Sequence, residues 1–464
     1  MIVSLVLLSM SFFRCTEELA LSTQTTNTAL ATTATTSTIA GAVACSDCKY
    51  VVPANTYTID GAQLGIKPGD VIGISGSRTT PLNFVNIVGT ADQPIIIRNC
   101  GNVQATVAVA SNASFAVKFT YSKYFRLTGG TEDGTYGIKI SGGTLGVSAD
   151  LLSTNFEIDH VEVSNTGFAG IMAKTNPSCD SRTWRGNFTM TDAFFHHNYV
   201  HDTGGEGFYV GNSFYASGES TSCGTLLPGE LKNIKIYNNR VVNSGYESIQ
   251  LGCAVSGAEI HDNVIENYGT MNVNVQNNGI QIGEGTGGLC YNNHIKNAVG
   301  TGAGIILLGL GDNVVFNNII LNSKGYGIFA DSRYTPGPGF KIVNNDIINP
   351  KLEGVRLYAA GSQYHHYVMN NLIANSGTYA TLGSNSYVHL LNSSVVATVT
   401  NNWNTQATLL ANYLQFGAIS TQILVNCPLV DRGASVSAYG VTKDFNNGAR
   451  PLGLGYDIGA IEYK

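Results

Sequence analysis

The chain repeats one short pattern many times after residue 158. An alternating apolar strand leads to an asparagine pair, an apolar residue, another asparagine, a glycine-containing turn and a second strand, as in IYNNRVVNSGYESIQLG and VFNNIILNSKGYGIFA. The second asparagine of the pair falls at Asn198, Asn239, Asn263, Asn293, Asn318, Asn345, Asn371 and Asn402. By subtraction, most successive positions lie 24 to 31 residues apart. This period is too long for a hairpin and fits one coil of three short strands.

Such a period predicts an all-β fold, a single-stranded right-handed parallel β-helix (solenoid) with asparagine ladders and loop insertions. Coils stack about 4.8 Å apart, so that amides at equal positions hydrogen-bond along the stack. The later asparagine forms a second column at Asn165, Asn243, Asn267, Asn297, Asn322, Asn349 and Asn375, with Asp202 in the same column. The apolar residues between the columns are expected to form the core: Val200, Val241, Ile265, Ile295, Ile320, Ile347 and Ile373.

The N-terminus predicts export. Residues 2–13 are apolar, too short a run to span a bilayer and typical of a signal peptide, and Cys15 directly after Arg14 resembles the lipidated cysteine of a bacterial lipoprotein. We expect a secreted protein or a lipoprotein of the cell surface or outer membrane. The chain is divided into a signal peptide (1–14), a lipid anchor and Ser/Thr/Ala-rich tether (15–44), a cap and first coils (45–130), β-helix repeats (131–405), and C-terminal coils with a terminal segment (406–464).

Charge limits the partners. The net charge is −6, so no basic field attracts nucleic acid, and contact with a membrane is expected only through an N-terminal lipid. We expect a monomer without an organic cofactor. The nine cysteines predict a mixture of disulfides and buried thiols. Cys45 and Cys48 lack the second pair that a zinc site needs, whereas Cys179 and Cys223 lie in loops of neighbouring coils and are suited to a bridge.

Alternate residues of the strand that follows each turn are expected to face solvent. This outward column is predicted to contain Lys139, Met172, Tyr209, Gln250, Gln281, Ile306, Phe329 and Arg356. Its middle, from Tyr209 to Gln281, combines hydrogen-bonding groups with an aromatic surface, as a sugar-binding groove requires. Gln250 and Gln281 are therefore candidate substrate-binding residues.

Glu206 and Glu247 occupy equivalent places on adjacent coils, so their carboxyl groups are expected to lie roughly 5 Å apart. Four interpretations remain open. One glutamate is held protonated, Ca²⁺ bridges the two with Asn278 from the next coil, the two act as acid and nucleophile of a retaining glycosidase, or both are ordinary surface charges. Glu206 and Glu247 are thus candidate catalytic and metal-binding residues, with Asn278 as a candidate metal ligand.

Two long insertions, 176–188 and 214–230, lie close to these residues in the repeat, and such loops on a rigid solenoid commonly build binding sites. The first contains Trp184 between Arg182 and Arg185, a stacking ring with two cations suited to an acidic sugar, or else a hydrophobic lid. Tyr209 and His201 are candidate catalytic bases. His196 and His197 are adjacent in sequence, so we expect them to face opposite sides of a strand, a poor geometry for binding metal.

The repeats, the opening KPGDVIGISG and the ending DFNNGARPLGLGYDIGAIEY resemble the pectate-lyase-like β-helix families of exported bacterial proteins. GGEGFYVGNS and GYESIQLG resemble coils of chondroitinase B and the β-helix alginate lyases. That resemblance implies that Glu247 matches a calcium-binding glutamate. However, the family's catalytic lysine and arginine positions hold Gly252 and Gly283.

The sequence therefore predicts an exported carbohydrate-active β-helix protein that binds and cleaves an extracellular, uronate-containing or neutral, polysaccharide by lyase or hydrolase chemistry. The alternative is a non-catalytic carbohydrate-binding or adhesive surface protein. Paired acids and long loops favour the enzyme, and the missing lysine and arginine favour the alternative.

Overall fold

A computed structural model describes residues 44–101, 103–331, 337–358, 364–377, 387–391, 393–405 and 429–462. The predicted signal peptide, Cys15 and almost all of the tether lie outside this range, as do residues 406–428. Among the described residues, no helix has the length and apolar character needed to cross a bilayer.

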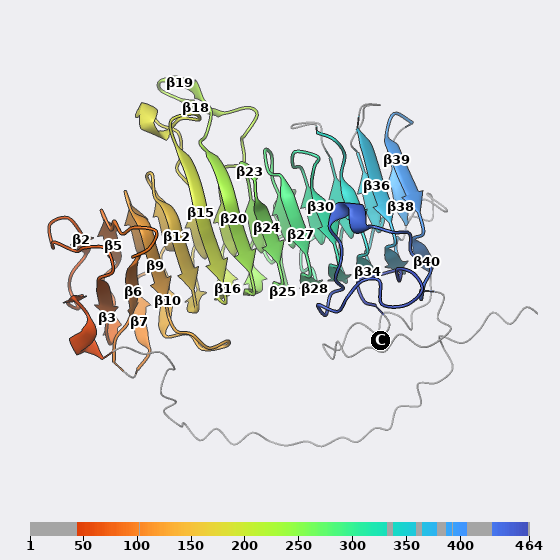
Figure 1. The fold of residues 1–464 in the computed structure, drawn as a ribbon. Coiled ribbons are helices and arrows are strands. Elements are labelled where there is room, and N and C mark those ends of the chain that lie inside the picture. The colour runs from red at the N-terminus through yellow and green to blue at the C-terminus, as the bar shows by residue number, and fades with distance from the viewer. Residues whose placement is uncertain are drawn as a thin grey trace, which may run out of the picture.

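The described chain winds into stacked coils, each adding one strand to three parallel sheets (Figure 1). The first sheet contains β1 (Tyr50–Val51), β3 (Val71–Ile74), β6 (Ile95–Asn99), β9 (Lys123–Thr128), β12 (Thr154–Asp159), β15 (Thr189–His196), β20 (Glu230–Tyr237), β24 (Ala258–His261), β27 (Gly288–Tyr291), β30 (Val314–Phe316), β33 (Lys341–Val343), β36 (His365–Met369) and β39 (Val396–Thr400), with β23 (Ala254–Ser256) beside β20.

The second sheet contains β4 (Ser77–Arg78), β7 (Ala105–Ala108), β10 (Ile138–Ser141), β13 (Val161–Ser164), β16 (Tyr199–Thr203), β21 (Arg240–Ser244), β25 (Val264–Glu266), β28 (His294–Lys296), β31 (Ile319–Leu321), β34 (Asp346–Ile348), β37 (Leu372–Ala374) and β40 (Trp403–Thr405). The third sheet contains β2 (Thr58–Asp60), β5 (Leu82–Val85), β8 (Phe115–Thr120), β11 (Leu145–Asp150), β14 (Ile171–Ala173), β17 (Phe208–Val210), β22 (Ile249–Leu251), β26 (Ile280–Ile282), β29 (Ile305–Leu307), β32 (Ile328–Ala330), β35 (Val355–Leu357) and β38 (Val388–Leu390).

Outside these sheets, β18 (Glu219–Thr221) and β19 (Gly224–Leu226) form a small antiparallel hairpin. It projects beyond the edge of the stack above β15 and β20 (Figure 1). The short 3₁₀ helices are η1 (Cys45–Asp47), η2 (Ser181–Thr183) and η4 (Ser437–Tyr439). The predicted fold, a right-handed parallel β-helix, is confirmed.

Both predicted asparagine columns are confirmed. In the first column each amide donates to the next, as from Asn263 Nδ2 to Asn293 Oδ1 at 2.9 Å, and the ladder is continuous from Asn198 to Asn402. In the second column the backbone is left-handed, with φ of 54° at Asp202 and 56° at Asn243. Asparagine and aspartate tolerate this conformation better than other side chains, which explains their recurrence there. The predicted core residues between the columns are fully buried.

Residues 429–462 do not add a coil but fold back against the outside of the later coils. Asn317 donates to the Lys443 carbonyl, and Asn344 donates to the carbonyls of Asp457 and Gly459. These asparagines begin the turns between the first and second sheets, so the segment covers that row of turns on the later coils. On the earlier coil that contains His197, residues 429–462 do not cover this row of turns.

Candidate functional site

The outer face of the third sheet carries most of the predicted site. Register pairs Met172 with Tyr209, Tyr209 with Gln250, and Gln250 with Gln281, as the sequence predicts. The prediction is wrong for Lys139, which lies on β10 of the second sheet and pairs with Glu162 at 3.1 Å. Ser148 takes its place beside Met172, because each coil contains two strands with similar alternation.

A hydrogen-bonded chain links the middle of this face. The Tyr209 hydroxyl lies 3.0 Å from Ser213 Oγ, Gln250 donates to the same Ser213 oxygen at 2.7 Å, and Gln281 donates to Gln250 Oε1 at 3.1 Å. Gln250 is only 4% exposed, so it holds its neighbours rather than offering a free surface. Tyr209 and Gln281 remain partly exposed and available to a ligand.

Lys174 is a site residue that sequence reasoning missed. Its ammonium lies 4.0 Å from the centre of the Tyr209 ring. Backbone hydrogen bonds run from Gly211 to Ala173, from Gly252 to Val210 and from Gly283 to Leu251, which places Lys174, Gly211, Gly252 and Gly283 in one column. Lys174 therefore lies in the same column as Gly252, two coils earlier.

Glu206 and Glu247 are buried, at 3% and 0% exposure, so the interpretation as ordinary surface charges is wrong. Their backbones lie on adjacent coils, where Gly207 donates to the Glu247 carbonyl. Burial raises the pKa of Glu206 to about 7. Burial, with a smaller repulsion from Glu206, raises the pKa of Glu247 to about 8. Each carboxyl group keeps one buried oxygen, Oε2, without a hydrogen-bond partner.

The structure brings Asn278 to this pair, but as a hydrogen-bond donor. Its Nδ2 donates to Glu247 Oε1 at 3.0 Å, while its Oδ1 accepts from the Ala303 amide at 3.0 Å. A Ca²⁺ ligand would have to present the oxygen, so the fit to the predicted metal site is incomplete. The Lys174 ammonium lowers the pKa of Glu206, although the opposing effect of burial is larger. Because Lys174 also lies over the Tyr209 ring, it is the residue that links Glu206 to Tyr209.

His201 is placed elsewhere. It lies on β16 of the second sheet, with Nδ1 2.6 Å from Asp202 and Nε2 3.4 Å from Glu162. Its ring stacks on Tyr199 at 4.3 Å. Both ring nitrogens of His201 thus contact carboxylates of the second sheet, whereas Tyr209 lies on the third sheet. The structure does not bring His201 together with Tyr209.

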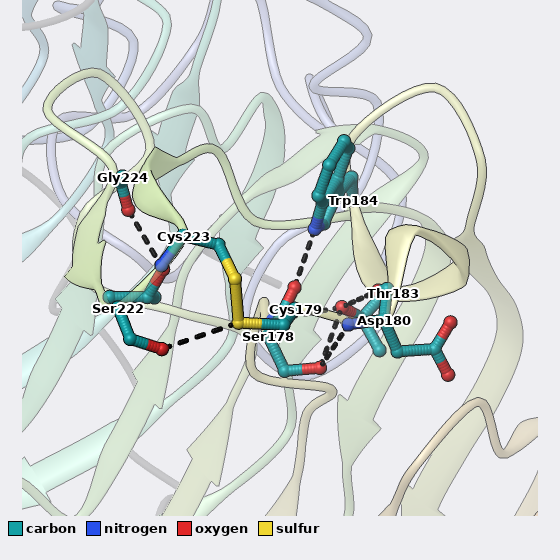
Figure 2. Close-up of a disulfide and its surroundings, with 9 residues drawn as sticks. Ser178, Cys179, Asp180, Thr183, Trp184, Ser222, Cys223 and Gly224 are labelled. Atoms are coloured by element: carbon teal, nitrogen blue, oxygen red, sulfur yellow. Dashed lines mark hydrogen bonds between the residues drawn. A yellow bond between two sulfur atoms is a disulfide. The ribbon is translucent and has the colours of Figure 1, made fainter.

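The two insertions meet through the predicted bridge between Cys179 and Cys223, whose Cα atoms are 5.7 Å apart (Figure 2). Figure 2 shows the Trp184 ring beside this bridge, with Nε1 donating to the Ser178 carbonyl at 2.6 Å. A second disulfide joins Cys45 to Cys100, and among the described cysteines Cys48, Cys253 and Cys290 are free thiols. The predicted mixture of bridges and thiols is confirmed for the described cysteines.

Both loop arginines have protein partners. Arg182 is exposed and pairs with Asp180 at 2.6 Å. Arg185 donates to the carbonyls of Pro228 and Tyr215 and lies 3.8 Å from the Tyr215 ring, so it fastens one insertion to the other. Of these two cations, only Arg182 is placed to meet an acidic ligand.

Replacing Cys179 and Cys223 by serine is expected to loosen the insertions while the coils stay folded. Arg185 still links the loops, so we expect about a tenfold faster native-state proteolysis within residues 176–188 and 214–230, consistent with the loss of ~1.4 kcal/mol of local stability. Limited proteolysis followed by mass spectrometry measures this rate. The Cys45→Ser/Cys100→Ser variant, at a distant bridge, is the control, and equal cleavage of the insertions in all three proteins would contradict the assignment.

Comparison with known proteins agrees with this architecture. The family described as "Right handed beta helix region" matches residues 220–376. A lacto-N-biosidase from Eubacterium ramulus aligns with a TM-score of 0.52 at 12% identity, over 78% of this chain and 68% of that chain. A pectate lyase aligns with a TM-score of 0.43 at 13% identity, over 90% of this chain and 97% of that chain.

An alginate lyase from Paenibacillus sp. str. FPU-7 aligns with a TM-score of 0.37 at 17% identity, over 78% of this chain and 99% of that chain. Among curated proteins, no sequence matches the chain. The chain is a right-handed parallel β-helix protein. Identities this low establish the fold alone.

Proposed function

We propose that this protein is an exported polysaccharide lyase that binds an extracellular, uronate-containing chain on the outer face of the third sheet. The observation that carries the proposal is the Lys174 ammonium 4.0 Å from the centre of the Tyr209 ring and close enough to the buried Glu206 to lower its pKa. The elimination requires Tyr209 as the phenolate, the form that accepts a proton, and Lys174 supplies a positive charge beside it.

In the proposed step the Tyr209 phenolate oxygen removes the proton from C5 of the uronate. The electron pair left on C5 forms the C4–C5 double bond, and the bond between C4 and the bridging oxygen breaks. The departing oxygen takes the proton from Tyr209, which returns to phenolate. The products are an unsaturated uronate end and a new reducing end, and Lys174 supplies positive charge beside the phenolate before and after the step.

Hydrolysis by the glutamate pair is disfavoured by burial. A retaining glycosidase needs both carboxyl groups at the sugar, whereas Glu206 and Glu247 are 3% and 0% exposed. Calcium binding remains part of the proposal. Glu206, Glu247 and Asn278 would hold the cation, and it would supply positive charge to a uronate bound nearby.

A non-catalytic carbohydrate-binding role is the second candidate. It is favoured by Gly252 and Gly283, which replace the lysine and arginine of the resembled family, and by the pairing of Arg182 with Asp180. Under this role Tyr209 and Gln281 would bind sugar without performing chemistry.

Tyr209→Phe separates the two candidates, because it removes the proton-accepting oxygen and keeps the ring. We expect the rate of unsaturated-product formation to fall about 10²–10⁴-fold, with polysaccharide binding changed little. Initial rates and affinity electrophoresis on the same polysaccharide measure the two effects, with Tyr57→Phe, a tyrosine 46% exposed on an N-terminal coil, as the control. An active Tyr209→Phe protein would overturn the assigned base.

A further inference from the structure

Two stacked histidines lie in the row of turns between the first and second sheets, away from the proposed sugar face. His160 and His197 directly follow β12 and β15, with φ of 52° and 55°. The corresponding positions of the next coils hold Asn238 and Asp262, also left-handed. The two imidazole rings are parallel, with centroids 5.0 Å apart. Histidine is among the residue types that accept this backbone, as asparagine and aspartate do, and at these two positions the imidazole rings also lie parallel to each other.

The expectation that His196 and His197 face opposite sides is wrong. The strand ends at His196, and His197 has a left-handed backbone that directs its ring toward the ring of His196. The Nδ1 atoms of the two histidines therefore lie 2.7 Å apart. Alternation of side chains holds only within a strand. The sequence could not show that the strand ends between the two residues.

His160 is arranged as a ligand by its surroundings. Its Nδ1 lies 2.6 Å from Asp159 Oδ2, and Arg126 and Thr128 hold that carboxylate in place. Nδ1 therefore carries the proton, and the lone pair is on Nε2. The His160 residue is only 5% exposed, and Nε2 has no hydrogen-bond partner. A histidine fixed by a carboxylate in this way is the common arrangement of metal-binding histidines.

His197 is fixed in the same sense through His196. The Nε2 atom of His196 donates to Glu157 Oε1 at 2.7 Å, so its Nδ1 accepts a hydrogen bond from His197 Nδ1. This leaves the lone pair of His197 on Nε2, which lies 3.2 Å from Asp133 Oδ1 and accepts a hydrogen bond from Asn238 Nδ2 at 3.2 Å, a bond that a bound metal would replace. Ligand atoms of Asp133, His160 and His197 all lie within 4.8 Å of one another.

We propose that Asp133, His160 and His197 bind a divalent transition-metal ion of the zinc class. Two imidazole nitrogens and one carboxylate oxygen form a donor set typical of a zinc site with an open fourth position. The metal would lie at a surface pocket whose lining includes Asp133, Tyr136, His197 and Arg240. Solvent or a small anionic ligand beside Arg240 would complete the coordination.

The test uses the purified full chain with zinc chloride, and cobalt(II) chloride as a spectroscopic probe. We expect one tightly held equivalent of zinc after dialysis, and a cobalt(II) visible spectrum typical of four-coordinate nitrogen and oxygen ligands. His160→Asn and His197→Asn each keep a residue that tolerates the left-handed turn, so they should fold normally, and each is expected to weaken zinc binding at least tenfold.

His365→Gln, a partly solvent-exposed histidine on β36, is the matched control and should bind like the unmodified protein. Unchanged stoichiometry and spectrum in the His160→Asn/His197→Asn protein would overturn the proposal. Failure of the folded, unmodified protein to retain zinc or to change the cobalt spectrum would overturn it as well. Circular dichroism of every variant verifies folding.

Discussion

Asn263→Ala is expected to lower the free energy of unfolding by about 3 kcal/mol or more, since each buried polar group left without a partner costs about 1–3 kcal/mol. The Asn263 amide donates to the Ile236 carbonyl and to Asn293, and its oxygen accepts from the backbone and side-chain nitrogens of Asn239. Alanine leaves the Asn239 backbone N–H and the Ile236 carbonyl buried without this partner. The side chains of Asn239 and Asn293 each lose one bond but keep another, to the Phe195 carbonyl and from the backbone amide of residue 263. Guanidinium denaturation followed by circular dichroism measures the change.

Asn274→Ala is the control for this prediction, because Asn274 is exposed in a surface loop. It should shift the denaturation midpoint very little. If the two variants were equally stable, the first asparagine column would not support the stack as described, and the explanation of the repeat would fail with it.

Replacing both Glu206 and Glu247 by glutamine is expected to remove a pH-dependent loss of stability. The pKa values of about 7 and about 8 lie above the ordinary 4.5, so the folded protein binds more protons than the unfolded chain between these values. Unfolding free energy therefore falls as the pH rises from about 5 to 8. At pH 8 in EDTA the double variant should be more stable by up to about 8 kcal/mol, because the two pKa values lie about 2.5 and about 3.5 above 4.5 and each pKa unit corresponds to about 1.4 kcal/mol.

At pH 5 both proteins should be nearly equal, since glutamine imitates the protonated carboxyl group. Other groups that titrate in the same range, including the buried Asp346, are unchanged in the variant, so the difference between the two proteins isolates the pair. Glu132→Gln, at an exposed position, is the control. A difference that does not grow with pH would contradict the buried, protonated state. Calcium that stabilises only the unmodified protein at pH 8 would support the cation site.

The repeat made the architecture predictable in detail. A fixed period places equal side chains on one column, so both asparagine columns and the register of Tyr209, Gln250 and Gln281 followed from counting. The Cys179–Cys223 bridge followed from two insertions on neighbouring coils. Counting predicts the wrong residue at Lys139, because this coil contains two strands with similar alternation, β10 and β11, and the residue that pairs with Met172 is Ser148 of β11.

The chemistry of the sites was less predictable, because it depends on burial and on turns. Glu206 and Glu247 were placed correctly, but nothing in the sequence showed that both would be enclosed. Placing Lys174 on this face requires the register of Gly211, Gly252 and Gly283 over several coils, and only the backbone hydrogen bonds reveal that register. The pairing of His196 with His197 depends on a single left-handed residue at the end of β15.

We propose that the third-sheet face cleaves a uronate-containing polysaccharide by elimination. The direct measurement is incubation of the purified protein with a panel of uronate-containing and neutral polysaccharides, with and without Ca²⁺, while ultraviolet absorbance of the unsaturated product and reducing ends are followed together. We predict that both signals rise in step on a uronate-containing substrate and that Tyr209→Phe lowers the rate of both about 10²–10⁴-fold. Reducing ends without the absorbance change, or retention of polysaccharide with neither signal, would contradict the claim.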